Sequence, residues 1–173
     1  YENINSQFVT INSWMENLLD KESVKRVVKI LNDFDSNLKV EVLNSSARTA
    51  SDAAAALNCE VGAIVKSLLL RADESFILCL VSGDKRCSLN KIKKMINKKD
   101  VSMANAYQVK SQTGFSIGGV SPVAHLEKIE ILVDSSLSRY ENVYAAAGHP
   151  NSIFKITYKQ LIKLTKGKEE DIV

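Results

Sequence analysis

The sequence has few cysteines, histidines and prolines, and these shortages exclude several kinds of site. Its 173 residues include three cysteines, two histidines and two prolines. An odd cysteine count without a Cys-x-x-Cys spacing argues against a disulfide framework and a structural zinc site. The two histidines, His125 and His149, have no cluster of further ligands around them in the sequence. We therefore expect no metal and no cofactor, and we expect Cys79, inside FILCLV, to be a small core residue.

The sequence also lacks the signatures of a transmembrane helix, a secretion leader and a nucleotide-binding loop. No apolar run approaches the roughly 18 residues that a transmembrane helix requires, and no charged-then-apolar leader stands at the start. Neither G-x-G-x-x-G nor a P-loop is present, which weakens nucleotide-cofactor and NTPase interpretations. A cytoplasmic protein is the expectation. The first residue is Tyr1 and not Met, which is compatible with a fragment or a trimmed chain.

The residues that are present indicate a globular chain with short, irregularly interleaved strands and helices. Hydrophobic residues make up 45% and charged residues 25%, which is typical of a globular domain. Period-2 and helical patterns predict the elements. Helices are expected within 12–33 (two, interrupted at 21–23), 45–57, 89–97, 106–112 and 158–164. Strands are expected at 39–43, 61–70, 76–82, 101–103, 128–134, 142–147 and 153–156.

This order of elements predicts a mixed α+β fold, with a mixed, mainly antiparallel sheet surrounded by helices. Segments 61–70 and 76–82 are expected to pair as a hairpin through the turn at 72–75. Thr49 is expected to cap the Ala-rich helix that follows it.

Two loops concentrate the residues that shape a backbone. Thr113–Pro122 (TGFSIGGVSP) contains Gly114, Gly118 and Gly119, and Ala145–Pro150 (AAAGHP) contains the other proline. Glycine allows backbone conformations closed to other residues, and proline fixes φ. Either loop alone could be an ordinary connection. Together they are the leading candidates for the walls of one site.

Lys66 is the strongest single candidate for chemistry. It lies in the apolar segment IVKSLLL, where strand alternation places Ile64, Lys66, Leu68 and Leu70 on one face. A lysine there either extends its ammonium to solvent at the strand end or enters a partly desolvated cavity, where its pKa would fall. The residues alone leave both possibilities open. His149 is likewise either a satisfied turn histidine or a donor at the rim of a pocket.

Two groups of lysines are more ambiguous. Lys91, Lys93, Lys94, Lys98 and Lys99 crowd one short helix, and Lys159, Lys163 and Lys166 recur near the end. Most such runs are solvated faces. No aromatic stacking motif accompanies them, so base readout is not implied, although attraction to a phosphate backbone is possible.

Taken in order, TASDAAAALNCEVGAIVKSLLL, LVSGD, TGFSIGGVSP and AAAGHP resemble the YbaK/ProX family of aminoacyl-tRNA deacylases. That family includes the editing domain of bacterial prolyl-tRNA synthetases and its free-standing relatives. The resemblance covers about residues 24–167. It implies a compact curved-sheet fold, with 1–23 as a helical extension and 24–173 as the editing domain.

The resemblance also implies roles for individual residues. The family's essential lysine corresponds to Lys66, which would be catalytic. The expected substrate-binding residues are Thr49, Gly118, Gly119, Ser121, Pro122, Gly148 and His149. The implied reaction is hydrolysis of the ester that joins a wrong amino acid to tRNA. Lys66 and main-chain N–H groups near Gly118 would stabilise the oxyanion, and the ribose hydroxyl would help to activate water.

The expected partners are mischarged tRNA and a prolyl-tRNA synthetase in cis or in trans, with no DNA and no membrane. Two alternatives stay open. One is a non-catalytic tRNA- or synthetase-binding module with the same fold. The other is a plain small-molecule-binding domain, which predicts no salt-dependent tRNA affinity.

Overall fold

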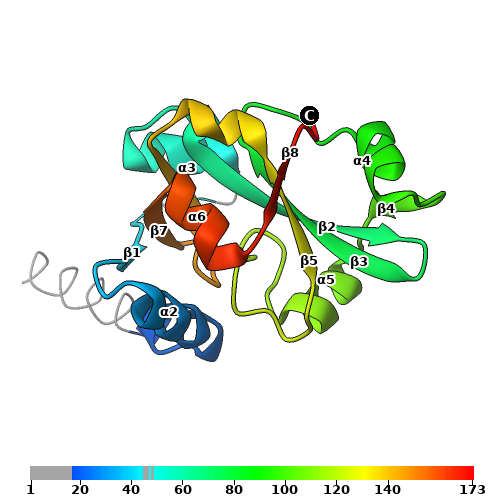
Figure 1. Cartoon of the computed structure of the whole chain (residues 1–173). Helices are drawn as coiled ribbons and strands as arrows, with labels where there is room; N and C mark the ends of the chain where they lie inside the picture. The colour runs from blue at the N-terminus through cyan, green and yellow to red at the C-terminus, as the bar shows by residue number, and fades with distance from the viewer. Residues whose placement is uncertain (1–16, 45–46, 48) are drawn as a thin grey trace, which may run out of the picture.

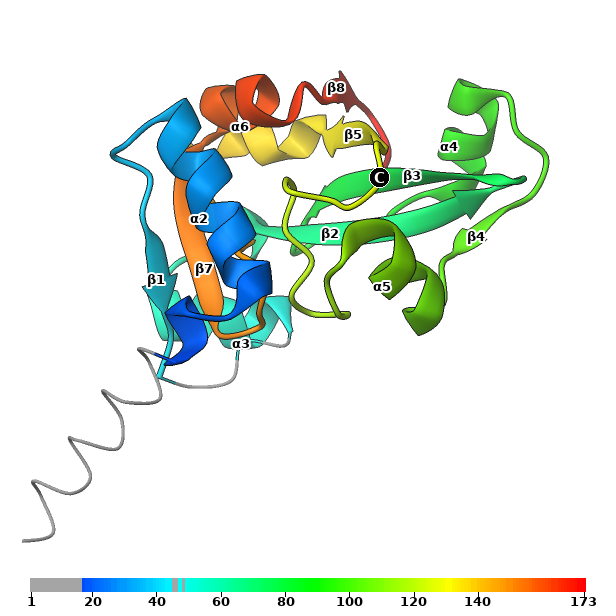
Figure 2. The ribbon, with the colours of Figure 1, turned by 90° about the horizontal axis from the view of Figure 1, so that it is seen from below.

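The computed structural model describes residues 17–44, 47 and 49–173. Figure 1 shows the whole chain and Figure 2 shows it from below. The helices are α2 (Glu22–Phe34), α3 (Ala50–Leu57), η1 (Val61–Ala63), α4 (Leu89–Ile96), α5 (Ala106–Thr113), η2 (Ser135–Arg139) and α6 (Tyr158–Thr165). The strands are β1 (Val40–Val42), β2 (Ile64–Ala72), β3 (Ser75–Ser82), β4 (Val101–Met103), β5 (Glu130–Asp134), β6 (Asn142–Ala146), β7 (Ser152–Thr157) and β8 (Lys168–Glu170).

The strands form one mixed sheet in the order β1-β7-β6-β2-β3-β5-β8, and β4 also pairs with β2. The β1–β7, β2–β3, β2–β4 and β6–β7 pairs are antiparallel. The β2–β6, β3–β5 and β5–β8 pairs are parallel. The predicted fold class and the predicted β2–β3 hairpin are therefore confirmed. The short strand β8 was not predicted, because its residues, Lys-Glu-Glu, are not typical of a strand.

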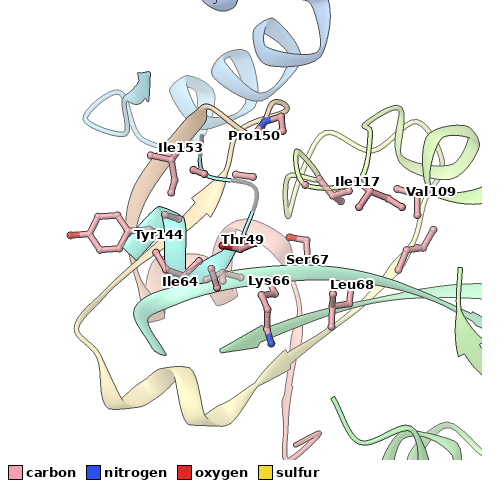
Figure 3. Close-up of a pocket in the computed structure, with 18 of the residues that line it drawn as sticks. Thr49, Ile64, Lys66, Ser67, Leu68, Val109, Ile117, Tyr144, Pro150 and Ile153 are labelled. Carbon is pink, nitrogen blue, oxygen red and sulfur yellow. The ribbon is translucent and has the colours of Figure 1, made fainter. Parts of the chain in front are cut away.

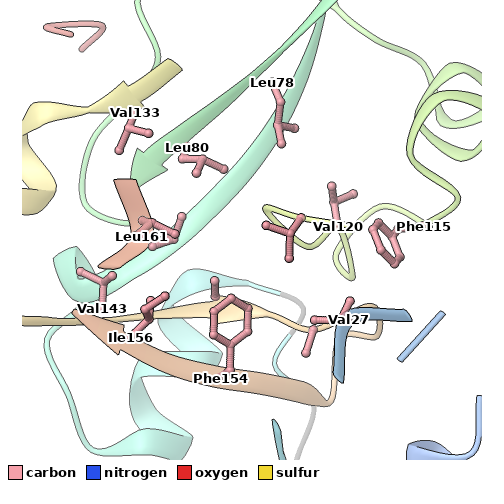
Figure 4. Close-up of a cluster of buried hydrophobic side chains, with 14 of the residues drawn as sticks. Val27, Leu78, Leu80, Phe115, Val120, Val133, Val143, Phe154, Ile156 and Leu161 are labelled. Atoms are coloured by element: carbon pink, nitrogen blue, oxygen red, sulfur yellow. The ribbon is translucent and has the colours of Figure 1, made fainter. Parts of the chain in front are cut away.

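Helices cover both faces of the β2–β3 hairpin. In Figure 1, α4 lies above the hairpin, whereas α2 and α5 lie below it. The larger core fills the lower side and includes Val27 of α2, Leu78 and Leu80 of β3, and Phe154 of β7 (Figure 4). A second core on the upper side packs Ile92 of α4 against other strand residues, with Cys79 among them, fully buried as predicted.

The sequence explains where several helices begin and end. The Thr49 hydroxyl accepts a hydrogen bond from Asp52 N at 3.1 Å, as its predicted capping role requires. Helix α3 begins at Ala50, later than the predicted start, and residues 45, 46 and 48 lie outside the described residues. Residues 17–19 are helical, and a break at Asp20 and Lys21 separates them from α2. The predicted pair of helices is thus seen in the described part of 12–33.

Helix α2 is an integral part of the core. Val24, Val27 and Leu31 on its inner face have no exposed surface. Arg26 donates to the carbonyl oxygens of Thr113 and Ala124, at 3.3 Å in each case, and lies 4.8 Å above the ring of Phe115. Because one carbonyl stands at the start of the glycine loop 113–122 and the other just after its end, Arg26 attaches α2 to that loop. The boundary expected between residues 23 and 24 falls in the first turn of this helix.

Candidate functional site

A pocket lies along one edge of β2, at a stretch where β3 is paired on the other edge and no strand is paired on this one. β6 pairs with β2 only at Ile64 and Val65, and β4 pairs with it only from Leu70 onward. Residues 66–68 therefore form a stretch of strand edge that no strand covers on this side. A cavity of about 400 Å³ opens along this edge. Its walls come from both sides of the sheet: α3 and the start of β2 on one side, α5 and the glycine loop on the other (Figure 3).

The main chain of Ser67 points into this gap. Ile64 C=O accepts from Gly83 N on the β3 side, and Leu69 C=O accepts from Ala104 N on the opposite side. Main-chain groups of successive strand residues alternate between the two edges. Those of Ser67 therefore point the same way as those of Leu69, yet the β6 and β4 ladders both stop short of Ser67. This leaves one N–H and one C=O available to a molecule in the pocket.

The Ser67 side chain adds a third polar group. Within the described residues, Ser67 Oγ is buried and has no hydrogen-bond partner. A buried hydroxyl without a partner costs about 1–3 kcal/mol. Such an atom is uncommon in a native structure and calls for a physical explanation. Its position in an otherwise largely apolar pocket supplies one, because a ligand bound there could complete its hydrogen bonding. The sequence pattern assigned no role to Ser67, and its hydroxyl without a partner is the signal that identifies it.

Lys66 also lines the pocket, but its ammonium points away from Ser67. Its Nζ donates to the main-chain oxygen of Lys85 at 2.5 Å, on the other side of β2 (Figure 3). The pKa of Lys66 is lowered, chiefly by burial, an effect that the neighbouring Cys87 and Asp84 partly oppose. Of the two possibilities that the sequence left open, this direction is the one expected for a partly desolvated lysine. To reach a molecule in the pocket, the ammonium must leave Lys85 and swing around the free edge of β2.

The two predicted loops lie against each other. A Cβ added at Gly119 would lie only 2.9 Å from the Cα of His149. Gly118 has φ +90° and borders the pocket beside Pro150. Gly148 has φ +98°, and a Cβ there would lie 2.6 Å from the carbonyl oxygen of Ser23 in α2. The glycines thus allow two loops and a helix to approach more closely than residues with a Cβ could.

The remaining predicted site residues divide into two groups. Thr49 and Gly118 line the pocket. Ser121 and Pro122, at the end of the loop 113–122, are buried. Ser121 Oγ accepts from Val123 N at 3.2 Å. The Ser121 carbonyl also bonds to a ring nitrogen of His125 at 2.7 Å. These contacts give Ser121 the geometry of a residue that shapes the loop from below.

His149 turns part of its side chain toward its own loop. Its Nδ1 accepts a hydrogen bond from Asn151 N at 3.0 Å. A nitrogen that accepts in this way is unprotonated, so the tautomer is the one with hydrogen on Nε2 when the ring is neutral. His149 therefore helps to hold the turn that follows Gly148.

A pair of cysteines borders the Lys66 ammonium. The pKa of the Cys87 thiol is lowered by its hydrogen bond with Cys79, while burial opposes that shift and Lys66 adds to it. The pKa of Cys79 is raised by the same hydrogen bond and by burial. All three cysteines are free. Across residues 17–44, 47 and 49–173, no group of three or more acidic, histidine or cysteine side chains is placed to hold a metal ion. No helix in the same part of the chain is long and apolar enough to cross a membrane.

The mixed sheet and its edge pocket, bordered by two glycine loops, define a small α+β domain with a candidate ligand-binding pocket. The pattern of the family described as "Aminoacyl-tRNA editing domain" matches residues 44–164. The chain belongs to this family, as the resemblance implied.

Individual proteins are also similar to this chain. A crystal structure described as that of a proposed trans-editing enzyme for prolyl tRNA synthetase is 38% identical, with a TM-score of 0.83 over 88% of this chain and 97% of that one. The uncharacterised protein YwhH of Bacillus subtilis is 29% identical over 84% of this chain and 93% of its own length. A proline–tRNA ligase of Caldicellulosiruptor saccharolyticus is 29% identical over 73% of this chain, which spans only 22% of that ligase.

Proposed function

We propose that this protein hydrolyses the ester bond of mischarged aminoacyl-tRNA. The observation on which the proposal depends is the pocket at the free edge of β2. It brings Lys66, the polar groups of Ser67 and the Gly118 loop around one cavity, in a chain of the editing family. A cavity of about 400 Å³ is within the range typical of small-molecule sites. It has room for an amino acid and part of the terminal adenosine.

The proposed reaction is an ordinary ester hydrolysis. A water oxygen attacks the aminoacyl carbonyl carbon, and the carbonyl oxygen becomes an oxyanion. The bond from that carbon to the ribose oxygen then breaks, and the ribose oxygen takes up a proton. The products are a free amino acid and a tRNA with an intact 3′ end. We assign activation of the water to the neighbouring ribose hydroxyl of the substrate.

Oxyanion stabilisation is assigned to Lys66 and to main-chain N–H groups. Donors already aimed at the developing charge commonly provide the largest catalytic contribution, and loss of one donor costs about 10²–10³-fold in rate. The Ser67 N–H at the strand edge and the loop N–H groups near Gly118 are such donors. Lys66 contributes after its ammonium exchanges Lys85 O for the substrate. Partial burial supports this role, because charge–dipole interactions are stronger away from water.

Selection of the amino acid is assigned to the pocket walls. Thr49, Gly118 and Gly119 limit the space directly or through packing, and Gly148 and His149 hold the second loop against the first. Ser121 and Pro122 fix the shape of the glycine loop from beneath. One methylene is worth only about 1–3 kcal/mol in a binding pocket, so a synthetase cannot exclude every smaller analogue at its own active site. A second site that admits small side chains and hydrolyses their esters corrects that failure.

The proposed context is translation in the cytoplasm. The substrate partner is mischarged tRNA, and a prolyl-tRNA synthetase acts with this domain either in trans or as part of the same chain. The related crystal structure described as that of a proposed trans-editing enzyme and the proline–tRNA ligase relative support this association.

Deacylation assays test the proposal. Purified protein is incubated with tRNA charged with alanine, serine, cysteine or threonine, and the loss of each ester is followed. We expect at least one of these esters to be hydrolysed faster than in buffer, and we expect Lys66→Ala to abolish the acceleration. A wild-type protein inert towards all four would contradict the proposal, and an unchanged Lys66→Ala variant would contradict the role of Lys66.

A non-catalytic tRNA-binding module is the second candidate. The observation that favours it is the bond from Lys66 Nζ to Lys85 O, which holds the ammonium out of the pocket. This alternative predicts saturable binding of aminoacyl-tRNA without turnover. Titrating binding and hydrolysis with the same substrate separates the two functions.

A further inference from the structure

One segment concentrates the positive charge of the chain. Residues 85–99 (KRCSLNKIKKMINKK) contain seven lysine and arginine residues and no aspartate or glutamate. The whole chain has a net charge of +3. The segment alone contributes +7, which leaves −4 for all the other residues. The net positive charge of the protein therefore comes from this segment, and the rest of the chain carries a net negative charge.

Neighbouring carboxylates leave most of this charge uncompensated. Asp84 and Asp100 flank the segment, but each pairs with an arginine from elsewhere, Arg139 and Arg71 respectively. Of the segment's cations, Lys91 forms a salt bridge, to Asp171 at 3.0 Å. Across the described residues, the remaining six have none. Like charges at helical spacing destabilise a helix slightly, so folding alone does not favour this arrangement.

The buried face of α4 directs these cations outward. Ile92 is completely buried against the upper core, with Leu89 and Met95 packed beside it. The opposite face consequently presents Lys91 and Lys94 to solvent, and Lys98 and Lys99 continue the exposed series beyond the end of the helix. Figures 1 and 2 show α4 standing clear of the other helices at one end of the molecule.

The segment begins at the candidate site. The Lys85 carbonyl is the group that holds the Lys66 ammonium. From there the chain passes along the hairpin to its far end, where the Asp100 carbonyl accepts from Asp73 N in the β2–β3 turn. At about 3.3 Å per residue, the nine residues of β2 span about 30 Å. The basic segment is therefore a track that starts beside Lys66 and continues away from the pocket.

We infer that segment 85–99 binds the phosphate backbone of tRNA near the 3′ end that enters the pocket. This inference rests on the proposed function for its partner. A polyanion whose terminal ester lies in the pocket must leave it along the protein surface, and the basic track starts at Lys66. Contacts of this kind position the substrate without reading its sequence. They make binding depend strongly on salt, because each neutralised phosphate releases counterions.

The test compares two triple variants with the same change in charge. Lys94, Lys98 and Lys99 are changed together to glutamine, and the control changes Lys159, Lys163 and Lys166, on and just after α6. Binding of uncharged tRNA is measured by fluorescence anisotropy at several salt concentrations. We expect the first variant to bind about tenfold or more weakly at low salt, with the salt slope reduced by about 2–3, whereas the control binds nearly as wild type does. Thermal unfolding confirms that both variants fold.

A second substrate separates this inference from the proposed function. Aminoacyl-adenosine has the ester but no backbone phosphates. We expect Lys94/Lys98/Lys99→Gln to hydrolyse it at the wild-type rate while its KM for mischarged tRNA rises. If wild type hydrolyses neither substrate, the proposed function fails, while the anisotropy result still decides the binding track. Equal losses in both triple variants, or loss of binding to anionic lipid vesicles instead of tRNA, would overturn the track.

Discussion

Gly119 packs directly against the main chain of His149, so closely that a Cβ at Gly119 would lie 2.9 Å from His149 Cα and 3.0 Å from His149 N. Real Cβ atoms almost never approach other heavy atoms within 3.0 Å. The atoms in the way belong to a backbone, and a backbone cannot rotate aside as a flexible side chain can. Because residue 119 is a glycine, the two glycine loops can lie in direct contact.

Gly119→Ala should separate the loops. Overpacking of this kind typically costs about 1–3 kcal/mol, so we expect the free energy of unfolding to fall by that amount. We also expect deacylation to drop, because the wall of the pocket moves. Urea denaturation and the deacylation assay measure the two effects. Ser116→Ala, at an exposed position of the same loop, is the control, and wild-type behaviour in Gly119→Ala would contradict the packing.

Ser67 and Ser82 should respond in opposite ways to removal of the hydroxyl. Ser82 Oγ bonds to Gly62 O, to Asp84 and to Arg139, so Ser82→Ala should lose about 1–3 kcal/mol of stability. Ser67 Oγ has no partner among the described residues. Ser67→Ala should therefore unfold at the same denaturant concentration as wild type or higher.

The rate at which Ser67→Ala hydrolyses mischarged tRNA is the second measurement. If the Ser67 hydroxyl bonds to substrate, Ser67→Ala should hydrolyse mischarged tRNA roughly tenfold more slowly, as expected for loss of one neutral hydrogen bond. A destabilised Ser67→Ala protein with full activity would show that the hydroxyl has a structural partner instead.

The activity of Lys66 should depend on pH in a defined direction. The charged ammonium is the proposed donor, and burial lowers its pKa below the ordinary 10.5. Hydrolysis above the spontaneous rate should therefore be constant below this lowered pKa and decline as pH rises through it. Lys66→Arg, which keeps its charge, should remove the decline. Lys155→Ala, at an exposed strand lysine, is the control, and a wild-type rate that keeps rising to pH 10.5 would exclude a cationic role.

Cys87 should be the first cysteine to react with an alkylating reagent. Its hydrogen bond with Cys79 and the nearby Lys66 lower its pKa, so more of it is thiolate at a given pH. Burial raises the pKa of Cys59, and Cys79 has no exposed surface. Mass spectrometry after brief iodoacetamide treatment should find the label on Cys87. Loss of deacylation should accompany it, because the added group lies against Lys66.

Cys87→Ser is the matched variant for this experiment. It should stay active after the same treatment. Labelling of Cys59 before Cys87, or full activity with Cys87 labelled, would contradict the arrangement of these side chains.

Much of the fold could be predicted because local patterns determine it. Apolar periodicity located the strands and helices, and the hydroxyl of Thr49 marked the start of α3. The lowered pKa of Lys66 is one of the two possibilities that its apolar neighbours in the sequence left open. β8 was missed because it is held by pairing with β5 and not by its own residues. The binding of α2 to the glycine loop through Arg26 joins residues far apart in the chain, which no local pattern reports.

The sequence by itself determined most of the helices and strands, the family and the two glycine loops, since these depend on residue type and spacing. Only the tertiary structure decided that β6 and β4 stop on either side of Ser67 and leave a strand edge open. It also decided that the Lys66 ammonium is bound to Lys85 O, at the start of the basic track. Both depend on strand register and on contacts between distant segments, and register is fixed only when the whole core packs.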